Sequence, residues 1–187
     1  IKDKTSRMVQ SMYEENPYPR WVSYTKNDLT HPSIILSEVC IGFDERAFGK
    51  PDRISILVAG CGTGVVAIED AVLWGGTEIQ AVDLSLTSLA YAMRCAEELQ
   101  LDSVSFAQAD ILELPTLGRN FDYISCVGVL HHMGNPIEGL RAISQVCRPG
   151  GVMRIGLYSK ASRRSLQKAI AFMKVQGDGS TAAGIRE

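Results

Sequence analysis

The chain alternates between short apolar runs and longer stretches in which apolar positions recur at helical spacing. The apolar runs predict strands at 54–59, 78–83, 104–107, 121–127 and 152–158. The stretches that separate or follow them predict helices at 65–74, 85–100, 136–147 and 162–174. Strands that are apolar throughout are buried on both faces, so this alternation predicts an α/β fold with a parallel sheet between helices. Right-handed crossovers make that sheet doubly wound.

The residues before the first strand have a different character. Aromatic side chains gather between Met8 and Asn27, and Ser33 to Phe48 predicts one amphipathic helix. We therefore interpret residues 1–52 as a helical N-terminal lead-in or lid, 53–160 as the core, and 161–187 as a C-terminal helix and tail. The chain begins with Ile1 and ends in a polar stretch, as expected of a trimmed piece of a longer protein.

Composition narrows the class of protein. The 187 residues are 45% hydrophobic and 21% charged, which is typical of one globular domain, and the net charge of -2 disfavours nucleic acid as a partner. No apolar run is long enough to span a membrane. The five cysteines form no CxxC pair and the chain has only three histidines, so we expect no disulfide framework, no metal site and a reducing cytoplasm.

A glycine-rich turn follows the first strand, at Gly60, Gly62 and Gly64. Such a turn exposes backbone N–H groups and lets a ligand approach the main chain. The dinucleotide fingerprint G-x-G-x-x-G fits it poorly. Asp83 ends the second strand, where a carboxylate can accept hydrogen bonds from both hydroxyls of a ribose. Together they favour a nucleoside-type ligand; the alternative is a tight turn with Asp83 as a helix cap.

A second acidic residue, Asp110, follows the third strand. Its carboxylate or backbone could recognise an exocyclic amine. Alternatively, Asp110 caps the turn that begins at Ile111.

Several motifs together resemble a known family. Residues 58–64, 81–85, 108–110, 121–124 and 148–151 look like the successive motifs of the Rossmann-like S-adenosylmethionine-dependent methyltransferases, in order and at similar spacing. The resemblance covers about 54–158. It implies a sheet of order 3-2-1-4-5 and S-adenosylmethionine as cofactor, leaving as S-adenosylhomocysteine.

The same resemblance implies roles for individual residues. The methionine part of the cofactor would lie against Gly60, Cys61, Gly62 and Gly64. Asp83 would hold the ribose with Leu84 beside the adenine, and Asp110 and Ile111 would contact the adenine. Val127 would lie next to the sulfonium.

The flanks extend the resemblance. Residues 13–21 and 155–159 are similar to bacterial methyltransferase domains joined to tetratricopeptide repeats, which implies such repeats in the full-length chain. The family sheet ends in a hairpin of two further strands. The residues after Tyr158 predict only a helix and a tail, so we expect the hairpin to be missing and one sheet edge to be bare or covered by something else.

Two groups of side chains are candidates for chemistry or substrate contact. His131 and His132 follow the fourth strand, and one of them could be a general base; alternatively they shape the turn or pack on the cofactor. The second group could close over the cofactor as a lid, bind an anionic acceptor or serve as an aromatic anchor on the sheet. Its members are Tyr13, Tyr18, Arg20 and Trp21.

The sequence thus predicts a methyltransferase that transfers a methyl group by in-line displacement to a small molecule or a protein. Amino-group nucleic-acid methyltransferases carry an Asp/Asn-Pro-Pro-aromatic motif after the fourth strand. Residues 126–129 are Cys-Val-Gly-Val instead, so nucleic acid is disfavoured as the acceptor. One alternative is a nicotinamide-dependent oxidoreductase. The other is a non-enzymatic cofactor-binding or assembly module, which the expected loss of the hairpin favours.

Overall fold

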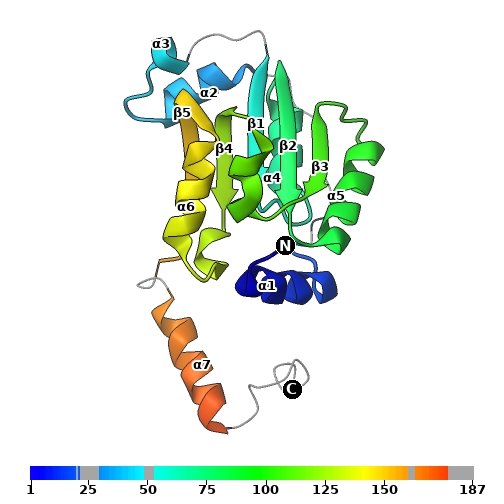
Figure 1. The fold of residues 1–187 in the computed structure, drawn as a ribbon, viewed down its shortest axis with the longest axis vertical. Helices are drawn as coiled ribbons and strands as arrows, with labels where there is room; N and C mark the ends of the chain where they lie inside the picture. Colours follow the sequence, from blue (N-terminus) through cyan, green and yellow to red (C-terminus); the bar gives the residue numbers. More distant parts are fainter. Residues whose placement is uncertain (20, 22–29, 49–52, 160–162, 177–187) are drawn as a thin grey trace. The chain divides into compact units, whose positions relative to one another are not determined.

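The computed structural model describes residues 1–19, 21, 30–48, 53–159 and 163–176, and the chain forms two compact units, 1–156 and 157–187. In the first unit five parallel strands form one sheet of order β3-β2-β1-β4-β5 (Figure 1). This confirms the predicted doubly wound, Rossmann-like sheet. The strands are β1 (Ile54–Ala59), β2 (Thr77–Asp83), β3 (Val104–Gln108), β4 (Phe121–Val127) and β5 (Cys147–Gly156).

Helices cover both faces of the sheet. One face carries α2 (Pro32–Val39), α3 (Glu45–Phe48), α4 (Val65–Leu73) and α5 (Leu86–Glu98). The other face carries η1 (Ile111–Leu117) and α6 (Pro136–Gln145). A short turn, η2 (Leu130–His132), follows β4, and α7 (Arg164–Gln176) lies in the second unit. The remaining helix, α1 (Lys4–Glu15), lies across the edge to which the strand arrows point (Figure 1).

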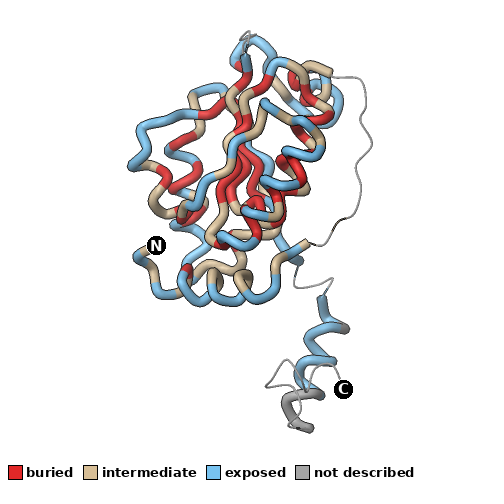
Figure 2. Tube along the Cα trace, turned by 90° about the vertical axis from the view of Figure 1, so that its right-hand side faces the viewer, coloured by how far each residue is buried: buried red, intermediate tan, exposed pale blue. Residues whose placement is uncertain are grey.

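The core follows from the alternation of side chains along the strands. In β1, Ile54, Ile56 and Val58 pack with α4, whereas Leu57 and Ala59 point to the opposite face. Both sets are buried, and the buried residues run through the middle of the sheet (Figure 2). Each buried side chain of this size contributes about 1.5–3 kcal/mol of transfer free energy, so this sheet is the rigid platform of the fold.

Two predicted elements differ from the structure. The single helix expected at 33–48 is two helices, because the chain turns after Val39 through Gly42, whose φ of 80° breaks a helix, and restarts where Asp44 accepts the N–H of Arg46 (2.9 Å). The fifth strand begins at Cys147 rather than at 152, since Cys147 already pairs with Phe121 before an irregularity in the register.

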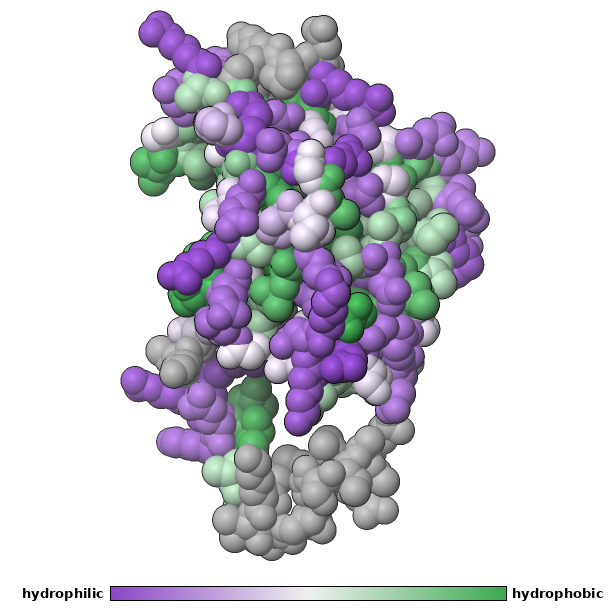
Figure 3. Space-filling view, in the orientation of Figure 1, coloured by the Kyte–Doolittle hydropathy of each residue, from purple (hydrophilic) through white to green (hydrophobic). Residues whose placement is uncertain are grey.

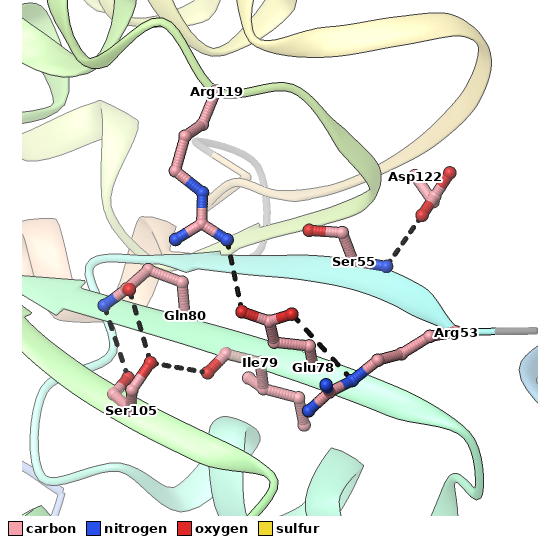
Figure 4. A network of polar contacts seen from close by, with 8 residues as sticks. All are labelled: Arg53, Ser55, Glu78, Ile79, Gln80, Ser105, Arg119 and Asp122. Carbon is pink, nitrogen blue, oxygen red and sulfur yellow. Dashed lines mark hydrogen bonds and ion pairs between the residues drawn. The ribbon is translucent and has the colours of Figure 1, made fainter.

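Polar side chains occupy the part of the sheet face that η1 and α6 leave uncovered. Glu78 on β2 lies 3.3 Å from Arg119 and 3.8 Å from Arg53, and Ser105 on β3 contacts Gln80 (Figure 4). These ion pairs are exposed and therefore add little stability. Hydrophilic residues are spread over most of the face that Figure 1 presents (Figure 3), which agrees with the mixed charge of the chain. Of the helices described, none has the length and apolarity to cross a bilayer.

Candidate functional site

The glycine turn after β1 has a backbone that only glycine adopts without strain. Gly60, Gly62 and Gly64 have φ values of 76°, 53° and 89°. A Cβ on Gly62 would overlap the carbonyl oxygen of Tyr18, and a Cβ on Gly64 would lie 2.6 Å from that of Ala92. The turn therefore brings its bare main chain to the carboxyl edge of the sheet, where ligands bind in open α/β folds.

Hydrogen bonds to β2 hold this turn in place. The N–H groups of Gly60 and Cys61 both donate to the carbonyl oxygen of Val82, at 2.8 and 2.9 Å. The Cys61 side chain is buried, and burial raises the pKa of its thiol well above the usual value. Cys61 thus packs as a small apolar residue and is not a nucleophile.

Asp83 ends β2 directly beside the glycine turn. One carboxylate oxygen accepts the N–H of Gly62 (2.8 Å) and the other accepts the N–H of Ser85 (2.9 Å). Burial raises the pKa of Asp83, although the bonds from Ser85 and Gly62 oppose the shift. The side chain is only partly buried, and a carboxylate oxygen that accepts one N–H can accept a further donor. The carboxylate therefore fits a ribose, whose two hydroxyls need two acceptors.

Asp110 has the capping role that was its alternative interpretation. It is 3% exposed, and its carboxylate accepts the N–H of Leu112 (3.1 Å) at the start of η1. Ile111 is buried in the core, whereas Leu84 is partly exposed and its carbonyl oxygen accepts the Gln108 side chain (2.9 Å). All these groups lie beside Asp83, at the ends of β2 and β3, where the adenine was expected.

The loop after β4 brings the two histidines to the same edge. Val127 ends β4 and is 39% exposed. In η2 the rings of His131 and His132 lie with centroids 4.2 Å apart. The hydroxyl of Tyr13 lies 3.5 Å from Nε2 of His132, and the two rings meet edge to face. His132 therefore lies between the loop after β4 and α1, with His131 beside it.

The segment after α1 packs on the glycine turn. The carbonyl oxygen of Tyr18 accepts the N–H of Thr63 (3.3 Å), and the indole N–H of Trp21 donates to the carbonyl oxygen of Thr63 (3.0 Å). Trp21 also meets Tyr91 of α5 edge to face, and the Tyr91 hydroxyl donates to the Trp21 carbonyl oxygen (2.7 Å). Trp21 is thus anchored on the core; Arg20 lies outside the described residues.

Glu14 is a site residue that the sequence did not reveal. Its carboxylate accepts the N–H groups of Leu86 (2.7 Å) and Thr87 (2.9 Å) and the hydroxyl of Thr87. The hydrogen bonds from Thr87, above all, lower the pKa of Glu14. No local pattern links it to the first turn of α5, because 72 residues of chain separate Glu14 from Leu86.

A second unforeseen group is Asp70, in the middle of α4. It is 4% exposed, and one of its carboxylate oxygens has no hydrogen-bond partner. Burial raises the pKa of Asp70 to about 7, against the opposing charge of Arg154. The sequence gives no signal here, because an isolated acid within an apolar helix pattern resembles a surface position.

Cysteine and metal chemistry find no support in the part of the chain that the structure describes. All five cysteines are free thiols, and burial raises the pKa of Cys126 to about 12. Among the described residues no three His, Cys, Asp or Glu side chains come together as metal ligands.

Comparisons with known proteins agree on one family. Residues 56–151 match the family model described as "Methyltransferase domain". An uncharacterised protein of Synechococcus sp. is 39% identical, over 99% of this chain and 45% of its own length. A ubiquinone biosynthesis O-methyltransferase of Leptothrix cholodnii is 30% identical, over 57% of this chain and 45% of its own. The chain thus spans less than half the length of these curated relatives.

Solved structures share the fold. The crystal structure of the [4+2]-cyclase SpnF superposes with a TM-score of 0.58 at 26% identity, covering 80% of this chain and 59% of that one. The protein in a structure titled for the conversion of a disulfide bond into a thioacetal group during echinomycin biosynthesis gives 0.62 at 25%, covering 90% and 65%.

Proposed function

The chain belongs to the methyltransferase domain family, whose methyl donor is S-adenosylmethionine, and we propose that it transfers the methyl group to a small-molecule acceptor, with a protein as the second choice. One observation carries the proposal. The Asp83 carboxylate lies at the carboxyl edge of the sheet, bonded to the main chain of the glycine turn and still able to accept two hydroxyl groups. A ribose bound there would place the rest of the cofactor along the turn.

Different residues of the site would hold different parts of the cofactor. Gly60, Cys61, Gly62 and Gly64 would hold the methionine part through the main chain. Leu84, Asp110 and Ile111 would border the adenine, and Val127 would lie near the sulfur. The cofactor supplies a methyl group already activated on a positively charged sulfur. The task of the protein is then to align an acceptor in line with the breaking bond and to exclude water, and alignment alone can lower a barrier by about 7–11 kcal/mol.

An acceptor that carries a hydroxyl must lose a proton as it is methylated. His132, with Tyr13 at 3.5 Å from its Nε2, is our candidate for a general base, and His131 is the second. The relative from Leptothrix cholodnii is named as an O-methyltransferase of ubiquinone biosynthesis, which favours a hydroxyl on a small molecule. The nicotinamide-dependent alternative has no such support from the comparisons.

Calorimetry with S-adenosylhomocysteine tests the proposal. Replacing Asp83 by alanine removes two hydrogen bonds to a charged acceptor, so we expect the affinity to fall by at least about tenfold. Asp102→Ala is the matched control, because Asp102 is an exposed aspartate beyond the far end of α5. Thermal unfolding of both variants confirms that they fold. Equal affinities of the unmodified chain and Asp83→Ala would refute the ribose role.

A cofactor-binding module without methyltransferase activity is the second candidate. Two findings favour this second candidate. A protein titled as a [4+2]-cyclase shares the fold, and this chain spans less than half the length of its curated relatives. Cofactor binding together with failure to methylate any of a panel of phenolic, amine and protein acceptors would support this candidate.

A further inference from the structure

The described residues of the N-terminal segment, 1–19 and 21, contact the loops that follow each of the first four strands. They reach Thr63 after β1 through Trp21, and Glu113 after β3 through an ion pair with Lys2 (3.0 Å). After β4, Thr5 packs so closely on Gly134 that an added Cβ there would lie 3.0 Å from its hydroxyl. With the contacts of Tyr13 to His132 and of Glu14 to α5 after β2, the segment lies along the edge to which the strand arrows point (Figure 1).

The contact between Glu14 and α5 comprises three hydrogen bonds. The first N–H groups of a helix have no partner within the helix, and its N-terminal end attracts negative charge. Here the N–H of Ser88 is accepted by the Ser85 hydroxyl (3.1 Å), and those of Leu86 and Thr87 are accepted by Glu14. By contrast, the side chain of Lys2 is 93% exposed, so its ion pair with Glu113 contributes little free energy to the contact.

Glu14 and Asp83 hold neighbouring parts of one turn. Asp83 accepts the N–H of Ser85, and Glu14 accepts that of Leu86, the next residue. Release of Glu14 would therefore free α1 while leaving the bonds of Asp83 intact. The negative charge of Glu14 also contributes to the raised pKa of Asp83, which places the two carboxylates within electrostatic reach.

We propose that Glu14 is a positioning residue, whose carboxylate latches α1 onto the first turn of α5 and so holds the N-terminal segment closed over bound S-adenosylmethionine. The proposal rests on the proposed function, because a latch matters only if this cleft takes the cofactor. It predicts that Glu14 controls the escape of the cofactor rather than its recognition. Tyr13 and Trp21 belong to the same N-terminal segment as Glu14. The contact of Glu14 with α5 therefore also keeps these two side chains at the site.

The test is the dissociation rate of S-adenosylhomocysteine, followed by tryptophan fluorescence in stopped flow. We expect Glu14→Ala to release the ligand at least about tenfold faster, with an association rate that does not fall. Glu15→Ala, an exposed glutamate one position further along α1, is the matched control and should match the unmodified chain. Thr87→Val removes one donor to Glu14, so its effect should be smaller and should disappear in the Glu14→Ala background.

A second readout separates a latch from a general loss of stability. Glu14→Gln removes the negative charge near Asp83, so the pH at which S-adenosylhomocysteine affinity falls by half should move lower. An unchanged release rate in both Glu14 variants would overturn the latch, as would additive effects of Glu14→Ala and Thr87→Val. If the unmodified chain binds no S-adenosylhomocysteine at all, the proposed function itself fails, and the latch fails with it.

Discussion

At the scale of single residues, Gly62 is held by close contact with a backbone atom. It has a φ of 53°, and a Cβ there would overlap the Tyr18 carbonyl oxygen. Gly118 has a similar φ of 63° but open space around its Cβ position. Comparing alanine variants of Gly62 and Gly118 therefore separates the cost of backbone strain from the cost of steric overlap.

We expect Gly62→Ala to lower the free energy of unfolding clearly more than Gly118→Ala. The strain of a left-handed backbone costs about 1–2 kcal/mol in both variants. Only Gly62→Ala must also displace Tyr18 from the glycine turn, so it alone should weaken S-adenosylhomocysteine binding. Urea unfolding and calorimetry measure the two effects, and equal losses in both variants would argue against close packing of the N-terminal segment.

Asp70 predicts a pH dependence of stability. Its pKa is about 7 in the folded protein and near 3.8 when unfolded, so the folded state binds more protons between these values. Stability is then fully present below pH 3.8 and falls as pH rises towards 7, at up to about 1.4 kcal/mol per pH unit from this group. Asp70→Asn should remove this loss, because its side chain has no proton to release.

Thermal unfolding at pH 5 and pH 8 measures the effect of Asp70. The unmodified chain should lose more stability between these pH values than Asp70→Asn does. Glu97→Gln is the control, since it changes an exposed carboxylate of another helix, α5. The same pH dependence in Asp70→Asn and the unmodified chain would show that Asp70 does not titrate as its burial implies.

At the scale of elements, capping residues link helix stability to the site. Ser85 caps α5 and Asn135 caps α6. Replacement of either by alanine should cost about 1 kcal/mol of unfolding free energy. Only Ser85→Ala should also weaken S-adenosylhomocysteine binding, because Ser85 belongs to the turn that Asp83 holds. Denaturation measures the stability of both variants, and calorimetry measures their affinity for S-adenosylhomocysteine. Equal affinities of the two variants would show that the turn at Ser85 is not part of the cofactor site.

The elements also show where sequence patterns stop being informative. Strand β4 is a local apolar run, and its bounds were predicted correctly. The start of β5 was wrong, because Arg148-Pro149-Gly150-Gly151 has the composition of a turn, yet Cys147 already pairs with β4 before it. The long helix at 33–48 was wrong because one glycine, Gly42, interrupts an otherwise helical pattern.

At the scale of the whole molecule, alternating strands and helices with right-handed crossovers predicted a doubly wound parallel sheet, but they did not predict how its edge is closed. The order 3-2-1-4-5, which the family resemblance implied, is the observed order, and it places Asp83 beside the glycine turn. The contact of Glu14 with α5 joins segments far apart in the chain, and no periodicity encodes it. Links of the chain to tetratricopeptide repeats stay a prediction.

A crystal structure of the chain with S-adenosylhomocysteine tests the central claim most directly. We expect the ribose hydroxyls within hydrogen-bonding distance of the Asp83 carboxylate, with the amino-acid end along residues 60–64 and α1 above the ligand. A cleft that stays empty at saturating ligand, or a nucleoside bound away from Asp83, would contradict the assignment of this edge of the sheet as the cofactor site.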